Sequence, residues 1–211
     1  DRIALFGYAH VPHMLPRQRR IDGTALPDQA ARFAMAQFGY RLLTGAGYVP
    51  VGFDHFALPD DPMAQAVREG RLRRNFQGFT DDPATTLLGL GASAIGCFPD
   101  LLVQNEKNAG RYRMLLSQDQ LPAALGVRRS ADDQRRGGVI EALLCRGAAL
   151  LDTELAAEVA SRLAPFIERG LAKLDRGELI VEPGGLPYTR TIAALFDPYR
   201  QDSVRQFSSA V

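Results

Sequence analysis

The sequence predicts an α/β fold in its first half and a mainly helical unit with one β-hairpin in its second half. Short apolar runs at residues 3–6 and 48–53 are typical of buried strands, and a helical pattern lies between them. A strand, a helix and a strand at this spacing indicate a βαβ unit with parallel pairing. After residue 105 helical patterns dominate. We therefore expect two units, residues 1–105 and residues 106–211.

The overall composition is that of an ordinary globular protein. The chain has 211 residues, of which 46% are hydrophobic and 23% are charged, so it is long enough to bury a sizeable core. Its formal net charge of +1 argues against nucleic acid as an obligatory partner, because such partners usually leave a basic excess. No apolar run approaches the roughly 20 residues of a membrane span. We expect a cytoplasmic protein without a membrane span.

The chain begins with Asp1 rather than Met, and a strand-like run follows almost directly. No charged-then-apolar leader is visible. About four strands are expected in residues 1–105, which is too few for a closed eight-stranded barrel. We therefore expect this chain to be a piece of a longer protein.

Two helices are predicted in the first unit. Pro27 and Asp28 open the first one, and Gly45 ends it. The second is shorter and spans residues 61–69. Residues at helical spacing form one apolar stripe on the first helix: Ala30, Ala34, Phe38 and Leu42, widened by Phe33 and Met35.

Residues 71–96 combine cations, amides and glycines, and they are predicted to form one wall of a pocket. Strand-like pieces lie around Phe76 and at residues 90–95, and residues 101–103 are a further candidate strand. Alternation in an extended segment puts two sets on opposite faces: Arg73, Asn75 and Gln77 on one, and Arg74, Phe76 and Gly78 on the other. Bare backbone at three glycines lets a ligand come close: Gly89, Gly91 and Gly96.

The second unit carries helices and a hairpin. Helices are predicted at residues 108–118, 153–163 and 187–195, and a further helix follows the N-cap sequence that begins at Ser130. The hairpin is predicted near residues 171–182, where Arg-Gly marks its turn. This order resembles a winged helix, but acidic residues match the cations, so no basic face builds up. A packing or substrate-covering module fits the charges better than nucleic-acid binding.

The histidines carry weak chemical patterns. His10, His13 and His55 do not have the spacing of a three-histidine metal site, and hydrogen-bonding loop residues are the favoured interpretation. Asp54 and His55 could form an acid–base pair, but adjacent strand residues point to opposite faces, so we expect only one of them to face a pocket. No catalytic residue and no metal ligand is assigned within this chain.

Several motifs resemble the oxygen-independent coproporphyrinogen III oxidase family. Two of them lie in the pocket wall, Arg-Asn-Phe-Gln-Gly-Phe-Thr at residues 74–80 and Leu-Leu-Gly-Leu-Gly at residues 87–91, followed by Ser-Ala-Ile at residues 93–95. Further motifs occur in the family's order: residues 8–12, 52–57, 68–70, 104–105, 195–197 with Tyr199, and 206–208. The resemblance covers essentially the whole chain, but only the carboxyl-terminal half of such an enzyme.

The resemblance implies a fold and a reaction. Residues 1–105 would be the carboxyl-terminal strands and helices of a partial (β/α) radical-SAM barrel, and residues 106–211 a helical carboxyl-terminal domain with a hairpin. The parent would be a radical S-adenosylmethionine oxidoreductase of haem biosynthesis. It would oxidatively decarboxylate two propionates of coproporphyrinogen III to vinyl groups through a 5′-deoxyadenosyl radical, which gives protoporphyrinogen IX. The parent is expected to be a monomer, and its electron donor is left open.

The resemblance also implies cofactors and their contacts. The parent would bind two S-adenosylmethionine molecules and one [4Fe–4S] cluster. Ala9 and Ile95 would contact S-adenosylmethionine, and Gln77 would help in the same cavity. We assign Arg74 to a substrate carboxylate from guanidinium–carboxylate geometry rather than from the family.

One departure from the family concerns the cluster. The Cys-x-x-x-Cys-x-x-Cys loop that holds it is not in this sequence. Cys97 and Cys145 are too far apart for a local metal or redox motif and are expected to be buried free thiols. They do not replace the loop, because a cluster needs three close thiolates. We expect the cluster to be bound by an amino-terminal half and this chain alone to be inactive.

Two other functions stay open at this point. A haem chaperone related to the radical-SAM enzymes is one, although the Arg-Asn-Phe-Gln-Gly motif argues against it. The other is a non-enzymatic binding module made of the helical unit after residue 105.

Overall fold

Three short strands near the amino terminus form an antiparallel sheet. The computed structural model describes residues 1–201, and its N-terminal sheet has the order β1 (Arg2–Ala4), β3 (His55–Ala57), β2 (Val49–Val51). The predicted parallel pairing is wrong. The chain leaving β2 turns back at once and inserts β3 between β1 and β2, antiparallel to both. Strands of three residues are too short for their apolar pattern to reveal such an insertion.

Helix α1 (Gln29–Gly45) connects β1 and β2, as the sequence predicts. Asp28 caps it by accepting a hydrogen bond from the Ala31 N–H at 2.8 Å. Its apolar stripe does not face the interior, because Phe38 and Leu42 are 60% and 58% exposed. Helical periodicity identifies an apolar face but not the surface that covers it. Two short 3-10 helices, Pro16–Arg20 and Gly23–Ala25, precede α1.

Helix α2 (Pro62–Arg68) follows β3 and confirms the second predicted helix. Its cap is Asp61, whose Oδ1 accepts the Met63 N–H at 2.8 Å. Asp61 also accepts the Arg2 Nε–H, at 2.8 Å to Oδ2, which joins α2 to β1. The helix packs against the N-terminal sheet in a small core: Val51, Ala57, Met63, Ala64, Leu72 and Cys145.

The predicted pocket wall folds as a hairpin followed by an irregular segment. β4 (Arg73–Asn75) pairs with β5 (Gly78–Thr80), so Phe76 and Gln77 form the turn between them. The strand predicted at residues 90–95 is wrong except at its end, where β6 (Ile95–Cys97) begins. Side-chain bonds hold the irregular backbone instead, because Asn105 Nδ2 donates to the carbonyl oxygens of Gly89 and Gly91 at 2.9 and 3.0 Å.

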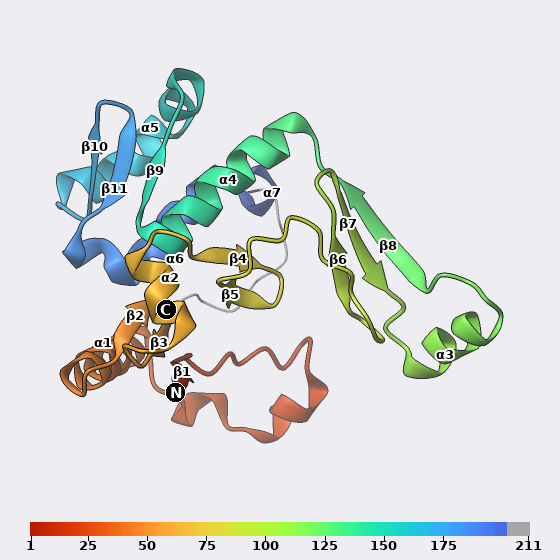
Figure 1. The fold of residues 1–211 in the computed structure, drawn as a ribbon. Helices are drawn as coiled ribbons and strands as arrows, with labels where there is room; N and C mark the ends of the chain where they lie inside the picture. The colour runs from red at the N-terminus through yellow and green to blue at the C-terminus, as the bar shows by residue number, and fades with distance from the viewer. Residues whose placement is uncertain (202–211) are drawn as a thin grey trace.

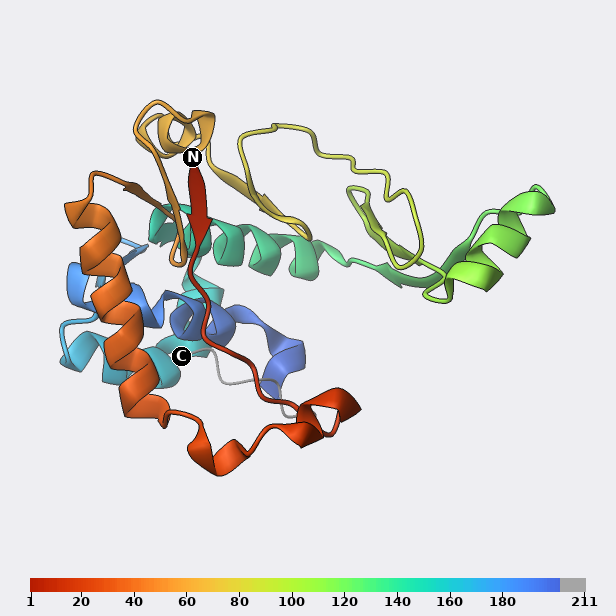
Figure 2. The same cartoon turned by 90° about the horizontal axis from the view of Figure 1, so that it is seen from below.

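A second sheet forms an arm that extends away from the rest of the molecule (Figures 1 and 2). Its order is β6, β7 (Leu101–Asn105), β8 (Ala123–Arg128), and α3 (Ala109–Ser117) joins the last two strands. The helix and β7 confirm predictions, whereas β8 was not predicted. The boundary predicted after residue 105 falls between β7 and β8 of this sheet. The division into two domains stays a prediction.

The remaining chain is mainly helical and contains the predicted hairpin. The larger elements are α4 (Ala131–Arg146), β9 (Ala148–Leu150), α5 (Thr153–Glu168), β10 (Ala172–Asp175) and β11 (Glu178–Val181). The shorter ones follow: η3 (Pro183–Tyr188), α6 (Thr189–Ala193), η4 (Ala194–Phe196) and α7 (Pro198–Gln201). The last predicted helix, residues 187–195, is thus divided between η3, α6 and η4. β9 adds a third strand to the hairpin.

The largest core lies in this helical part. Its fully buried side chains include Leu143, Leu155, Val159, Leu163, Leu179, Ile192 and Phe196. The predicted N-cap of α4 is confirmed as a capping box. Ser130 Oγ accepts the Asp133 N–H at 3.1 Å, and Asp133 Oδ2 accepts the Ser130 N–H at 2.8 Å.

The class predicted from the sequence agrees with the structure, since helices and sheets together form the fold. The strand pairs within residues 1–201 are all antiparallel, and this part of the chain contains no closed barrel. No helix in the described part has the length and apolar character needed to cross a membrane. The motif at residues 206–208 lies outside the described residues.

Candidate functional site

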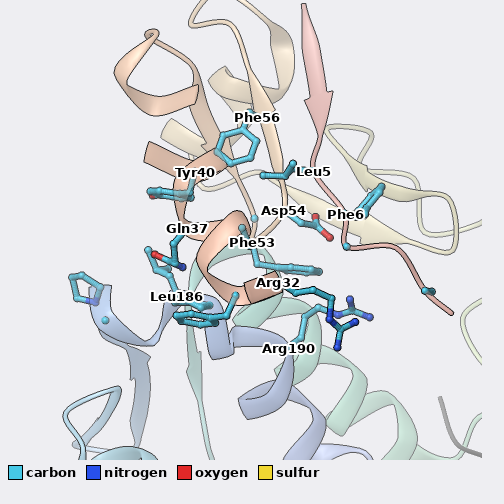
Figure 3. Close-up of a pocket in the computed structure, with 18 residues that line it drawn as sticks. Leu5, Phe6, Arg32, Gln37, Tyr40, Phe53, Asp54, Phe56, Leu186 and Arg190 are labelled. Carbon is cyan, nitrogen blue, oxygen red and sulfur yellow. The ribbon is translucent and has the colours of Figure 1, made fainter. Parts of the chain in front are cut away.

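A cavity of about 330 Å³ lies between the N-terminal sheet, helix α1 and the η3–α6 region (Figure 3). Much of its wall is apolar, and these side chains include Leu5, Phe33, Tyr40, Phe53, Phe56 and Leu186. The polar side chains that line it are Arg32, Gln37, Asp54 and Arg190. An apolar wall with a few polar groups is typical of a small-molecule site.

Two strand ends meet at this cavity. β1 and β2 point in the same direction, because each is antiparallel to β3. The chain leaving β1 supplies Leu5 and Ala9 to the wall, and the chain leaving β2 supplies Phe53 and Asp54. The Leu5 N–H donates to the Asp54 carbonyl oxygen at 2.9 Å and ties the two segments together. Gly52, with φ of 64°, provides the left-handed backbone that the turn requires.

Aromatic rings and guanidinium groups gather beside the cavity. The Phe53 and Phe79 rings meet edge to face, with centroids 5.7 Å apart. The Arg74 guanidinium lies 4.8 Å from the Phe79 centroid and 5.5 Å from that of Phe53. Arg190 approaches the Phe53 ring as well, at 5.4 Å. Phe53 is therefore contacted by two cations from distant parts of the chain, and both contacts have cation–π geometry.

Asp54 and His55 contact each other directly. His55 Nδ1 and Asp54 Oδ1 are 2.6 Å apart, and the imidazole lies edge to face with Phe79 at 5.3 Å. Asp54 belongs to the turn between β2 and β3 rather than to a strand, so strand alternation does not separate the two side chains. Asp54 lines the cavity, and its carboxylate fixes the orientation of the ring beside it.

Comparison with known proteins shows the family. No protein-family model matches the chain. The oxygen-independent coproporphyrinogen III oxidase of Bradyrhizobium diazoefficiens is 42% identical to it over 100% of the chain and 49% of the relative. The protein of the same description from Thermostichus vulcanus is 38% identical over 100% of the chain and 69% of the relative. The chain belongs to this family.

A solved structure agrees with this assignment. The coproporphyrinogen III oxidase of Escherichia coli, described as a radical SAM enzyme, superposes with a TM-score of 0.86 at 36% identity. The match covers 94% of this chain and 48% of that one. The chain spans about half the length of most of the curated oxidases that it matches.

Of the residues that the resemblance assigned, Ala9 lines the cavity of this oxidase-family chain. Its carbonyl oxygen accepts a hydrogen bond from Gln18 Nε2 at 2.9 Å, which fixes the loop after β1. Arg74 does not line the cavity but contacts Phe53, which does. The roles of Ala9 and Arg74 stay predictions.

Gln77 and Ile95 lie outside the cavity wall. Gln77 is exposed in the β4–β5 turn, where its N–H donates to Asn75 Oδ1 at 2.8 Å. The expectation that Arg73, Asn75 and Gln77 share one strand face is therefore wrong, because the strand ends at Asn75. Ile95 is half-buried in β6, opposite Gln104. The cofactor roles proposed for Gln77 and Ile95 remain predictions.

The cysteines do not fit an iron–sulfur cluster. Cys145 is buried on α4, and burial raises the pKa of its thiol to about 12, whereas a cluster ligand must be a thiolate. Both cysteines are free, as expected, but the expected burial is wrong for Cys97, which is half-buried on the arm. Within residues 1–201 no group of three or more His, Cys, Asp or Glu side chains is placed to hold a metal ion.

Sequence reasoning missed two cationic groups of the site, Arg32 and Arg190. Arg32 lies in the first turn of α1, and Arg190 lies in α6, so no motif spacing connects them. Arg190 is one of the cations that acidic residues match in the second unit, so the charge pattern does not single it out. Both side chains line the same cavity, and that cavity exists only where the η3–α6 region packs beside α1.

Proposed function

We propose that this chain acts as about half of an oxygen-independent coproporphyrinogen III oxidase, which decarboxylates two propionates of coproporphyrinogen III to vinyl groups. The observation that carries the proposal is the similarity along the whole chain to oxidases of this description, at 35% to 42% identity. The TM-score of 0.86 to a radical SAM enzyme supports it in three dimensions. In this proposal the N-terminal sheet, α1 and α2 belong to a partial (β/α) barrel that other residues complete.

The cluster would be held by residues beyond this chain. Neither cysteine here fits it, since Cys145 is a buried thiol on α4 and Cys97 lies on the arm. When bound, S-adenosylmethionine and a reduced [4Fe–4S] cluster would supply the radical that starts the reaction. Ala9, Gln77 and Ile95 would contact S-adenosylmethionine. The cavity wall at Ala9 provides apolar surface and backbone for such contacts.

The side chains beside the cavity would position the porphyrinogen. The Arg74 guanidinium would bind a carboxylate of the substrate, and Phe53 and Phe79 hold its planar group in a fixed orientation. The apolar wall would exclude water from the reacting propionate, so that the reactive intermediate is not lost to solvent. This chain would thus contribute orientation and water exclusion rather than the radical chemistry.

The test compares this chain with the same chain joined to an amino-terminal half that carries the cluster loop. Both proteins are reconstituted with iron and sulfide and assayed without oxygen, with S-adenosylmethionine, a reductant and coproporphyrinogen III. We expect protoporphyrinogen IX from the joined protein only. The 211-residue chain should be inactive and should lack the visible absorption of thiolate-bound iron. A joined protein that assembles the cluster but converts no substrate contradicts the proposed function.

A further inference from the structure

We propose that Arg32 and Arg190 form a carboxylate-binding pair at one end of the cavity. Arg32 enters the cavity from α1 and Arg190 from α6, and Figure 3 shows both guanidinium groups at the same end. Guanidinium is the side-chain group best suited to carboxylates, because its N–H groups match both carboxylate oxygens. The identity of the carboxylate rests on the proposed function, whereas the binding pair itself does not.

The Arg32 side chain has one nitrogen without a partner among the described residues. Its Nε is buried, and no hydrogen-bond acceptor within residues 1–201 contacts it. A buried charged donor without an acceptor costs free energy, so such a group is expected to find its acceptor elsewhere. A ligand in the cavity can supply that acceptor, because Arg32 lines the wall.

Several other guanidinium groups that are at least partly buried are neutralised by carboxylates of the protein itself, whereas Arg74 and Arg129 are not. Arg73 pairs with Glu141 at 2.7 Å, and Arg136 pairs with Glu158 at 2.6 Å. In the described part of the chain neither Arg32 nor Arg190 forms such an ion pair. These two guanidinium groups of the cavity wall therefore have no carboxylate partner in the described part of the chain.

The acidic side chain in the cavity wall, Asp54, forms no ion pair with Arg32 or Arg190 within the described residues. Asp54 lines the cavity, but its Oδ1 is 2.6 Å from His55 Nδ1. Arg190 instead lies over the Phe53 ring at 5.4 Å, a contact that orients the guanidinium without neutralising it. A ligand carboxylate can supply the ion-pair partner that Arg32 and Arg190 lack within residues 1–201.

The size and the rest of the wall restrict the ligand. A volume of about 330 Å³ is near the lower end for small-molecule pockets, roughly 300–1,000 Å³. It suits one apolar ring with a short acidic arm rather than a whole macrocycle. Leu5, Phe56 and Leu186 would contact the ring. A pyrrole ring with its propionate has this chemistry, and the carboxylate of S-adenosylmethionine is the other source of the same group.

The experiment measures binding to the 211-residue chain and its variants Arg32→Gln and Arg190→Gln. The probes are coproporphyrin III, followed by fluorescence, its tetramethyl ester, which has no free carboxylate, and S-adenosylmethionine, followed by calorimetry. We expect each variant to bind coproporphyrin III about 10-fold more weakly or worse. Binding of the ester should change little. The control Arg41→Gln, on an exposed position of α1, should bind as the wild type does.

The outcomes distinguish the two sources of the carboxylate, and they separate the arginine pair from the proposed function. Weaker binding of S-adenosylmethionine alone keeps the pair and identifies the cofactor as its ligand. Any of three results overturns the pair. In the first, the variants bind coproporphyrin III and S-adenosylmethionine as tightly as the wild type does. In the second, they lose as much affinity for the ester as for coproporphyrin III. The third result is a wild type that binds neither coproporphyrin III nor S-adenosylmethionine. Because Arg190 is exposed, its variant keeps the test usable if Arg32→Gln unfolds. An inactive joined enzyme with arginine-dependent binding contradicts only the proposed function.

Discussion

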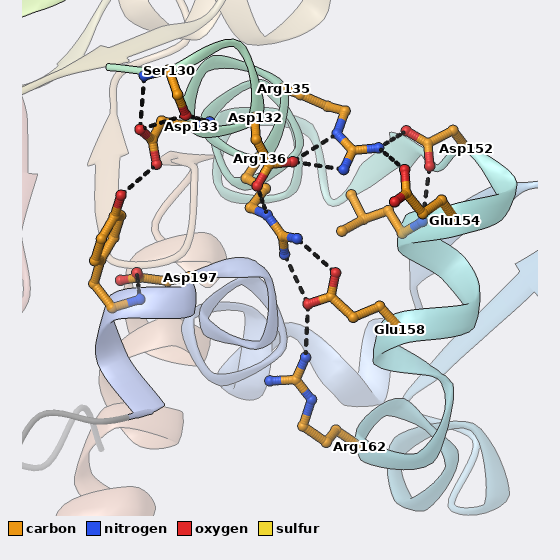
Figure 4. Close-up of polar contacts among 12 residues, drawn as sticks. Ser130, Asp132, Asp133, Arg135, Arg136, Asp152, Glu154, Glu158, Arg162 and Asp197 are labelled. Carbon is orange, nitrogen blue, oxygen red and sulfur yellow. Dashed lines mark hydrogen bonds and ion pairs between the residues drawn. The ribbon is translucent and has the colours of Figure 1, made fainter. Parts of the chain in front are cut away.

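Arg136 and Glu158 are joined by two parallel hydrogen bonds between α4 and α5. Arg136 Nη1 donates to Glu158 Oε1 at 3.0 Å, and Nη2 donates to Oε2 at 2.6 Å (Figure 4). Arg136 Nε also donates to Asp132 Oδ2 at 2.6 Å. Only 10% of the Arg136 side chain is exposed, so its charge depends on these partners. Neighbouring Arg135 extends the network to Asp152.

The first prediction concerns the strength of this network. Arg136→Met keeps most of the apolar stem but removes three charge-assisted hydrogen bonds, so we expect the free energy of unfolding to fall by about 1–3 kcal/mol. Urea denaturation followed by circular dichroism measures it. The control is Arg113→Met on the exposed face of α3, where the change should stay within about 0.5 kcal/mol. Equal losses in the two variants would contradict a stabilising role for the pair.

The second prediction is a loss of stability in acid. Hydrogen bonds from Arg136 lower the carboxyl pKa of both Glu158 and Asp132. A lowered pKa in the folded state means that the unfolded chain binds protons more tightly. The stabilisation is therefore complete above the usual carboxyl pKa values, 4.5 for Glu and 3.8 for Asp. It is lost as the pH falls through the lower folded values.

Denaturation at a series of pH values from about 7 to about 3 tests this linkage. The wild type should lose stability mainly below about pH 4.5, and Glu158→Gln should show a smaller loss over the same range because one titrating partner is gone. Identical slopes in the two proteins would show that Glu158 does not contribute. The variant Glu168→Gln, at the end of α5, is a suitable control, because that side chain is exposed and forms no ion pair within residues 1–201.

The third prediction concerns thiol reactivity. Burial raises the pKa of the Cys145 thiol to about 12, so almost no thiolate forms at about pH 8. In a Cys97→Ser variant, which leaves Cys145 as the single thiol, Ellman's reagent should react only after denaturant is added. Rapid reaction of this native variant would show that the core between α4 and the N-terminal sheet opens readily.

The fourth prediction concerns the turn that carries Phe53 and Asp54. An ideal Cβ on Gly52 would lie 2.0 Å from the Phe79 ring, and Gly52 has φ of 64°. Gly70 has nearly the same φ, 67°, but open space around it. Gly70→Ala should therefore cost only backbone strain, about 1 kcal/mol.

Gly52→Ala should cost about 1–3 kcal/mol more than Gly70→Ala, because the Phe79 ring must also move. Thermal or urea denaturation of the two variants measures the difference. Displacement of the ring should also weaken coproporphyrin III binding in Gly52→Ala and leave it unchanged in Gly70→Ala. Equal stability of the two variants would mean that Phe79 is not held against the turn.

Local features of this fold could be predicted from the sequence. The caps at Asp28, Asp61 and Ser130 form between residues two or three positions apart, so the helices that follow them were expected. The hairpin near residues 171–182 was also expected from its Arg-Gly turn, and in the structure Arg176 and Gly177 both adopt positive φ there. The motif at residues 74–80 indicated the family, since that relationship is carried by residue identity rather than by contacts.

Non-local contacts decided the features that sequence reasoning got wrong or missed. β3 enters the sheet between β1 and β2, and β8 pairs with β7 across α3, because hydrogen bonds join segments far apart in the chain. The exposed stripe of α1 shows the same limit, since periodicity defines a face and not its partner.

The candidate site shows the same distinction between local and non-local features. The sequence by itself determined the family, the local helices and the residues of the Arg-Asn-Phe-Gln-Gly motif. Only the tertiary structure decided that Ala9 lines the cavity, that Gln77 lies in an exposed turn, and that Arg32 and Arg190 point into one end of the cavity. The physical reason is the distance along the chain between the residues that form each feature. Caps and turns depend on neighbouring residues, whereas a cavity exists only where distant segments pack against one another.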